Sequence, residues 1–417
     1  MDKNKLIIYQ INPRMFTHMG NLREAKKLLP HIKSVGANVA YLFAICKEDD
    51  SKDRKFWSKR QKKSKLNNPK NPYRISDYFS IDEEFGGNEQ LKEFIDEAHK
   101  LGLYVMMDLV YFHCSPNAKI INEVPDSVVR KENGEIDLGE WNFPKLNYKS
   151  RALRDYLIKN MLYYILEYGV DGYRCDVGDI VPLDFWQEAV FEIKKIKPDV
   201  IMLNEGSNPD YVQSGTFDFN YYWKPFVLAT KPYSQFFKTH HSNFEQTTKE
   251  KGIYFVENHD SVTDDGRAET IFNSLLCDLF YVYLFTVNGT PLIYCGEEIA
   301  DKNEHNMFAN KDHNKGYGID WSNSLLPHGK RRLSLIKKLS YLRKTEDCLA
   351  YGDFSWLDVD DEILSFERIY KNEKITVFIN FSTIIKNINK CGSSILSRNY
   401  KNGKLSKYGF IIFKEIL

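Results

Sequence analysis

Eight short apolar runs alternate with helical patterns along most of this sequence, and this alternation limits the possible folds more than any other feature. Strands that alternate with helices favour a parallel sheet, and eight strand–helix units favour a closed (β/α)8 barrel, or TIM barrel. The expected strands are residues 6–11, 38–45, 104–110, 171–176, 200–203, 217–221, 253–256 and 291–294. The expected helices are residues 21–35, 88–100, 150–165, 182–195, 268–287 and 325–342.

Several stretches interrupt this alternation. Residues 46–71 are rich in Lys, Asp and Ser and are predicted to form a loop, and residues 72–81 are aromatic but irregular. Residues 114–149 are polar and contain Pro and Gly, which favours a short subdomain inserted after the third strand. From about residue 349, short alternating runs favour a small antiparallel β-sandwich. The predicted domains are a barrel at 1–113 and 150–347, the inserted subdomain at 114–149 and a C-terminal all-β domain at 348–417.

Composition narrows the possible partners. The net charge of +1 over 417 residues gives no reason to expect nucleic acid or a membrane surface as partner. Aromatic residues make up 14% of the chain, which fits either a Tyr/Phe-rich core or a cleft in which rings stack on sugars. The seven cysteines form no CxxC pair, and the apolar run Leu6–Tyr9 is too short for a signal peptide. We therefore expect a reduced, cytoplasmic protein.

Charged side chains lie at or just after the carboxyl ends of four of the expected strands. In a barrel these strand ends face one mouth, where barrel enzymes keep their reactive groups. Two nearby carboxyl groups, one protonated and one ionised, are what glycoside hydrolysis needs. An isolated aspartate at the end of a strand is more often a helix cap or a salt-bridge partner, so the argument rests on the common position of these residues. The residues are Asp108 and His113, Arg174 and Asp176, Glu205, and His259 and Asp260.

The motifs around these residues resemble those of the α-amylase superfamily, glycoside hydrolase family 13, and the resemblance covers nearly the whole chain. Its opening strand is similar to residues 9–14, its loop before the third strand to residues 73–78, and its strand 8 region to residues 289–298. Its four best-known regions are similar to residues 108–113, 172–176, 204–206 and 258–260. A bacterial-type intracellular member of the family is the closest description.

The resemblance implies a role for each carboxylate. Asp176 would be the nucleophile that forms a covalent glycosyl-enzyme, and Glu205 would be the general acid and then the base. Asp260 would hold sugar hydroxyls and stabilise the transition state. Arg174 would hydrogen-bond the nucleophile, which keeps an aspartate ionised. Asp108 would support the loop and Arg174.

The remaining implied roles concern the sugar itself. His113 and His259 would bind hydroxyls of the sugar at the cleavage point, and Tyr73 would stack on its ring. Without the resemblance, Tyr73 would be interpreted as a packed loop aromatic.

Two departures from the family pattern bear on calcium. The family usually has Asn where this chain has Phe112, and Asp where it has Lys145, and in many relatives those positions supply calcium ligands. Calcium takes oxygen ligands, preferably charged ones. Phe112 offers none and Lys145 adds a positive charge, so we expect no calcium at this site and no other cofactor. Lys145 replacing the ion electrostatically is a hypothesis.

A third departure concerns the substrate. Residues 177–179 (Val-Gly-Asp) lack the Lys-His pair that starch-degrading α-amylases often carry, and the stretch is closer to the cyclomaltodextrinase and neopullulanase branch. The first strand begins at residue 6, so the extra N-terminal domain of that branch is not expected. The resemblance implies a retaining hydrolase of α-glucosidic bonds, mainly α-1,4, in maltooligosaccharides. A transglycosylase or phosphorylase of the same superfamily, and an inactive sugar-binding barrel, remain alternatives. The oligomeric state is not predicted.

Overall fold

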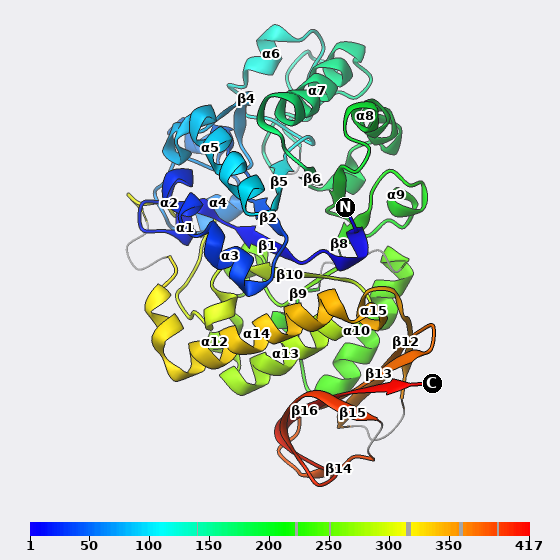
Figure 1. Ribbon diagram of the computed structural model, residues 1–417. Helices are drawn as coiled ribbons and strands as arrows, with labels where there is room; N and C mark the ends of the chain where they lie inside the picture. The colour runs from blue at the N-terminus through cyan, green and yellow to red at the C-terminus, as the bar shows by residue number, and fades with distance from the viewer. Residues whose placement is uncertain (140, 222–223, 250–251, 314–317, 358–361, 390–391) are drawn as a thin grey trace.

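A closed barrel of eight parallel strands forms the centre of the computed structural model (Figure 1), which describes residues 1–417 except 140, 222–223, 250–251, 314–317, 358–361 and 390–391. The predicted barrel is thereby confirmed, with strand order β1-β10-β9-β8-β7-β6-β5-β2. The strands are β1 (Ile8–Ile11), β2 (Val39–Leu42), β5 (Tyr104–Leu109), β6 (Gly172–Cys175), β7 (Ile201–Asn204), β8 (Phe219–Tyr221), β9 (Gly252–Phe255) and β10 (Thr290–Tyr294).

The interior of the barrel is a packed core. Alternate strand residues point inward, because side chains on a strand alternate between its two faces. Twelve buried apolar residues, among them Ile8, Val39 and Met106, form one cluster there. Side chains of the opposite strand faces pack against the surrounding helices in a second, larger cluster. The barrel therefore provides a rigid base for its upper rim.

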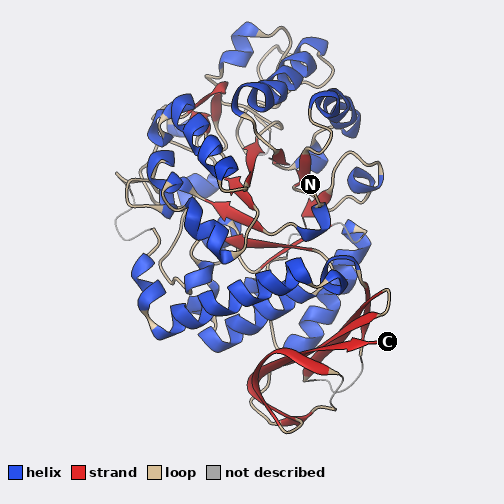
Figure 2. Ribbon diagram, viewed as in Figure 1, coloured by secondary structure: helices blue, strands red, loops and turns tan. Residues whose placement is uncertain are grey.

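Helices surround the barrel (Figure 2), as the alternation predicts. The longer ones are α5 (Gly87–Lys100), α7 (Arg151–Tyr163), α8 (Leu183–Ile196), α10 (Tyr233–Thr248), α13 (Ser274–Thr286) and α14 (Pro327–Thr345). The short ones are α1 (Pro13–Phe16), α2 (Leu22–Lys26), α3 (Leu29–Val35), α9 (Asp210–Gln213), α12 (Ala268–Ile271) and α15 (Asp347–Tyr351). Within the described part of the chain, no helix combines the length and apolar character needed to cross a membrane.

Two predicted helices are divided in the structure. The helix expected at 21–35 is α2 and α3, and Pro30 lies in the first turn of α3, where its missing N–H breaks no hydrogen bond. The helix expected at 268–287 is α12 and α13, and the Asn273 side chain caps α13 by accepting from the Leu276 N–H. Helix α10 was not predicted.

The polar stretch 46–71 is more ordered than the predicted loop. It contains β3 (Cys46–Glu48) and α4 (Lys59–Lys63), and β3 pairs with β4 (Ile75–Ile81), a strand that the sequence did not predict. Buried polar side chains hold the segment together: Gln61 donates to the carbonyl of Asn68, and Arg74 to that of Pro69. The prediction was wrong because this order comes from side chain to backbone hydrogen bonds rather than from an apolar core.

The inserted stretch 114–149 contains the short helix α6 (Lys119–Glu123) and isolated antiparallel bridges, and a further bridge joins Lys145 to His113, which precedes the stretch. The domain limits at 113/114, 149/150 and 347/348 stay predictions.

The C-terminal region is antiparallel, as expected. Its strands are β11 (Asp353–Trp356), β12 (Ile363–Tyr370), β13 (Glu373–Asn380), β14 (Lys386–Asn387), β15 (Ser393–Lys401) and β16 (Lys404–Ile416). Hydrogen bonds join them into one sheet rather than two separate ones, and β16 pairs with β13, β14 and β15. Six of the seven cysteines are free and buried, and Cys391 lies outside the described residues.

Candidate active site

The first two candidate carboxylates start from the same level of the barrel rim. Cys175 at the end of β6 is in register with Asn204 at the end of β7, and Asp176 and Glu205 follow these residues directly. Both are almost completely buried, with 7% and 2% of the residue exposed. Neighbouring strands of the barrel therefore bring the two carboxyl groups together.

Asp260 lies at the same end of the barrel, in the first turn of α11 (His259–Asp264), which follows β9. One strand, β8, separates β9 from β7. Asn258 caps this helix: its side chain accepts from the N–H groups of Asp260 and Ser261, and the Ser261 hydroxyl accepts from the Asn258 N–H. Such a capping box satisfies the free N–H groups of a helix start and fixes its direction. The local sequence thus fixes the orientation of Asp260.

Arg174 lies beneath the carboxylates, fully buried in the barrel. Its Nη1 is 2.9 Å from Asp108 Oδ1 and 2.7 Å from Asp176 Oδ1, and its Nη2 forms an ion pair with Glu205. The Tyr41 hydroxyl donates to the second oxygen of Asp108 at 2.7 Å. One guanidinium therefore joins three buried carboxyl groups, which explains how so much charge is accommodated inside the barrel.

The surroundings move the pKa values of Glu205 and Asp260 in opposite directions. Burial raises the pKa of Glu205 well above its usual range, against the opposing charge of Arg174, and the charges of Asp176 and Asp260 raise it further. Burial also acts to raise the pKa of Asp260, but His259 and Arg60 outweigh it and hold that pKa well below normal. One carboxyl group suited to donate a proton thus lies beside one that stays ionised.

The aromatic and histidine side chains form a connected group. The Tyr73 hydroxyl is 2.6 Å from His259 Nε2, and the other ring nitrogen of His259 is 2.7 Å from Gln10 Nε2. His113 Nε2 lies 2.9 Å from the Tyr73 carbonyl oxygen. Burial lowers the pKa of His113 to about 4, so its imidazole is neutral at physiological pH.

These residues surround a cavity of about 240 Å³. Five of the eight predicted site residues line it: Tyr73, His113, Asp176, Glu205 and Asp260. Arg174 and His259 do not line it but contact residues that do, and Asp108 contacts Arg174. The other lining residues are Ser58, Arg60, Asn71, Trp141, Phe143, Val177, Asp264, Met307 and Phe308. The structure thus brings all eight predicted residues into one connected site.

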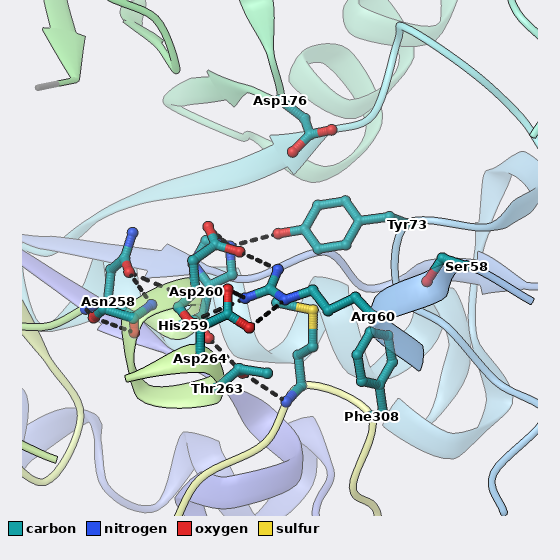
Figure 3. Close-up of polar contacts among 12 residues, drawn as sticks. Ser58, Arg60, Tyr73, Asp176, Asn258, His259, Asp260, Thr263, Asp264 and Phe308 are labelled. Atoms are coloured by element: carbon teal, nitrogen blue, oxygen red, sulfur yellow. Dashed lines mark hydrogen bonds and ion pairs between the residues drawn. The ribbon is translucent and has the colours of Figure 1, made fainter. Parts of the chain in front are cut away.

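Arg60 is the main member of the site that the sequence did not reveal. It lies in α4, and its Nη1 is 2.6 Å from Asp260 Oδ1 while its Nε is 2.9 Å from Asp264 Oδ1 (Figure 3). Its own neighbours include Lys59, Lys62 and Lys63, so nothing local distinguishes it from a solvated basic face. Trp141, Met307 and Phe308 likewise carried no signal in the sequence.

The residues at the usual calcium position do not fit that ion. Phe112 packs edge to face on Trp141, with ring centroids 5.3 Å apart, and Lys145 Nζ is 3.4 Å from Asp137 Oδ2. Among the described residues, no group of three or more His, Cys, Asp or Glu side chains could hold a metal ion. A donor set without a charged oxygen at these two positions disfavours calcium, and its absence from the protein stays a prediction.

A (β/α)8 barrel with paired carboxyl groups at the carboxyl ends of its strands is the arrangement of a barrel glycosidase. The family model described as the catalytic domain of alpha amylase matches residues 10–138 and 135–347. The chain therefore belongs to the α-amylase family.

Similarity to individual proteins extends over most of the chain. It is 25% identical over 397 residues to a cyclomaltodextrinase of Thermoanaerobacter pseudethanolicus, covering 87% of this chain and 64% of that protein. It is also 25% identical over 349 residues to the intracellular maltogenic amylase of Bacillus subtilis strain 168, covering 76% of this chain and 57% of that protein. The chain thus spans less than two thirds of the length of these relatives.

Solved structures of the same fold include an α-amylase from Lactobacillus plantarum, with a TM-score of 0.78, 22% identity and 99% of both chains covered. The noncanonic maltogenic α-amylase AmyB from Thermotoga neapolitana has a TM-score of 0.77 and 24% identity, with 100% of this chain and 97% of that one covered. At this level of identity the likeness establishes the fold.

Proposed function

We propose that the protein is a retaining glycoside hydrolase that cleaves α-glucosidic bonds, mainly α-1,4, in maltooligosaccharides or related α-glucans. The observation that carries the proposal is the pair Asp176 and Glu205 on one rim, both in contact with the guanidinium of Arg174. Carboxyl groups that share one guanidinium are close together, and in retaining enzymes the pair is about 5–5.5 Å apart. We place the reaction in the cytoplasm, and a relative named intracellular maltogenic amylase supports this.

In the first half of the proposed reaction, Glu205 is the acid. Burial raises its pKa, which favours the protonated form, and the carboxyl group gives its proton to the glycosidic oxygen as the C–O bond breaks. The Asp176 carboxylate attacks the anomeric carbon from the opposite side and forms an ester with the sugar. The released sugar leaves with the proton from Glu205.

In the second half, Glu205 is the base. Its carboxylate takes a proton from water, and the water oxygen replaces Asp176 at the anomeric carbon, which frees the nucleophile and returns the proton to Glu205. Two inversions give net retention of configuration. Asp260, His113, His259 and Tyr73 hold the sugar during both halves. The Nε2–H of neutral His113 donates to the Tyr73 carbonyl, which leaves Nδ1 to accept a hydrogen bond from a sugar hydroxyl.

Transfer to a sugar or to phosphate, in place of water, is the second candidate. A relative named alpha-1,4-glucan:maltose-1-phosphate maltosyltransferase, from Picrophilus torridus, is 25% identical over 401 residues and keeps this alternative open. It would use the same carboxyl groups and differ in what enters the acceptor side. A sugar-binding barrel without activity is the third candidate, and the presence of all three carboxylates, Asp176, Glu205 and Asp260, disfavours it.

Product analysis on maltose, maltotriose, isomaltose, pullulan, trehalose and sucrose, with and without phosphate, tests the proposal. We expect shorter sugars from maltotriose in the absence of phosphate and no activity of Asp176→Asn. Products longer than the substrate would favour the transglycosylase, and a phosphate requirement would favour the phosphorylase. Binding of an α-glucan by a wild-type protein that cleaves none of them would favour the inactive barrel.

A further inference from the structure

We propose that Arg60, Met307 and Phe308 form a wall that closes the site on the side of the sugar that is retained, so that the enzyme accepts only the non-reducing end of an α-glucan and releases one glucosyl unit at a time. This inference rests on the proposed function, because it needs Glu205 to face the leaving group. We call these three residues the glycone wall.

The barrel topology places the glycone wall opposite Glu205. Glu205 follows β7, and β1 is four strands away from β7 in either direction around the closed barrel. The two neighbours of β1 are β2 and β10. Arg60 belongs to the segment after β2, and Met307 and Phe308 belong to the segment after β10. Since the leaving group lies beside the acid, the wall lies beyond the sugar that becomes attached to Asp176.

Hydrogen bonds from Arg60 anchor one half of the wall. Its Nη1 donates to Asp260 Oδ1 at 2.6 Å, its Nη2 to the Asp260 carbonyl at 3.0 Å and its Nε to Asp264 Oδ1 at 2.9 Å. Figure 3 shows the guanidinium lying between these two carboxylates and the ring of Phe308. A side chain held by two carboxylates is a fixed boundary rather than a mobile surface group.

The other half is tied to its surroundings as firmly. The Asn68 side chain donates to the Phe308 carbonyl at 2.8 Å, which joins the segments after β2 and β10. The Met307 N–H donates to the Thr263 hydroxyl at 3.1 Å, which joins the segment after β10 to α11. Met307 and Phe308 are both 2% exposed and pack on Phe43. Three separate segments thus form one continuous boundary.

Size and charge define what fits against this wall. The cavity of about 240 Å³ is smaller than the roughly 300–1,000 Å³ usual for ligand pockets, which favours a single sugar ring over a segment of chain. The charge of Arg60 is balanced by Asp260 and Asp264, so the wall does not select an anionic sugar. Of its five N–H groups, one on Nη1 has no acceptor among the described residues and can donate to a hydroxyl of a terminal glucose.

The test compares a linear substrate, which has a non-reducing end, with a cyclic substrate that has the same number of glucosyl units and no end. We expect the wild type to convert maltoheptaose with glucose as the first product, and to cleave β-cyclodextrin at least about 100-fold more slowly, because misplacement of about 1 Å already costs that much. Arg60→Ala and Phe308→Ala should raise the cyclic-to-linear rate ratio at least tenfold. Lys62→Ala, an exposed cation on the same helix, should leave the ratio unchanged.

The ratio is the readout because Arg60 also contacts Asp260 and its loss lowers the absolute rate. Phe308→Ala opens the wall without removing a contact to Asp260, and melting curves verify that each variant is folded. The proposal would be overturned if the wild type cleaved β-cyclodextrin at a rate within tenfold of its rate on maltoheptaose. It would also be overturned if the first products from maltoheptaose were oligosaccharides from cleavage at internal bonds rather than glucose. Failure to cleave maltoheptaose at all would instead overturn the proposed function on which it rests.

Discussion

Replacement of Arg174 by methionine tests whether one guanidinium holds the site together. The change keeps much of the side-chain volume but leaves Asp108, Asp176 and Glu205 without the cation that contacts all three. Breaking a buried ion pair by removing one partner costs about 3–5 kcal/mol, because a charge stays buried without compensation. We expect a loss of unfolding free energy in this range near pH 8.

The loss should shrink as the pH falls. Burial already raises the folded-state pKa of Asp108 and of Glu205 against the opposing charge of Arg174, and removal of that charge raises both further. Groups with a raised folded-state pKa contribute stability at low pH and lose it as the pH rises through that pKa. The variant should therefore be closer to the wild type near pH 5 than near pH 8.

Urea or thermal unfolding at both pH values measures the effect, with Arg151→Met as the matched control. Arg151 also pairs with two carboxylates, Asp155 and Glu188, but its side chain is 57% exposed. Exposed pairs are worth at most about 1 kcal/mol, so this variant should change little at either pH. If Arg174→Met is no more destabilising near pH 8 than Arg151→Met, the reasoning about Arg174 is refuted.

Three further predictions concern the chemistry. Glu205→Gln should lower kcat on maltooligosaccharides about 10²–10⁴-fold and remove the alkaline decline of the pH–rate profile, because the acid must be protonated. Glucosyl fluoride, whose leaving group needs no proton, should still glycosylate the variant. Equal losses of rate on both substrates would contradict the role of Glu205 as the acid. Tyr73→Phe removes a hydroxyl 2.6 Å from His259 Nε2, a bond of a kind worth about 0.5–1.5 kcal/mol of stability, so Tm should fall slightly. Because the hydroxyl also positions His259 at the sugar, kcat/KM should fall as well, and an unchanged kcat/KM would argue against a role for the hydroxyl. Because Phe112 and Lys145 stand where calcium ligands are usual, a chelator should change neither Tm nor activity; stabilisation by added calcium, traced to this loop by mass analysis, would show the site to be present.

The sequence predicts the barrel well because each barrel strand coincides with a short apolar run that can be recognised locally. It fails for α10, whose Ser, Thr, Asn and His residues have low intrinsic helix propensity. That helix forms because Phe236, Phe237 and Phe244 are buried, a tertiary effect that overrides propensity. The strand β4 was missed for a similar reason, since its partner β3 lies in a segment too polar to be recognised as part of a sheet.

The same distinction applies to the site. The ends of barrel strands converge on one mouth, so the positions of Asp176, Glu205 and Asp260 follow from the strand pattern together with the family resemblance. Arg60 is 200 residues from Asp260 in the chain, and only the folded path of the segment after β2 brings the two together. Contacts of this kind depend on loop geometry that local sequence does not encode.

The central claim is that Asp176 forms a covalent bond to the sugar. Incubation with a 5-fluoroglucosyl fluoride, which slows breakdown of the intermediate, followed by mass spectrometry of the digested protein, measures this directly. We predict the addition of one fluoroglucosyl group to the peptide that carries Cys175 and Asp176, and none in Asp176→Asn. A label on Glu205 or Asp260, or an active enzyme that accumulates no label at all, would contradict the account.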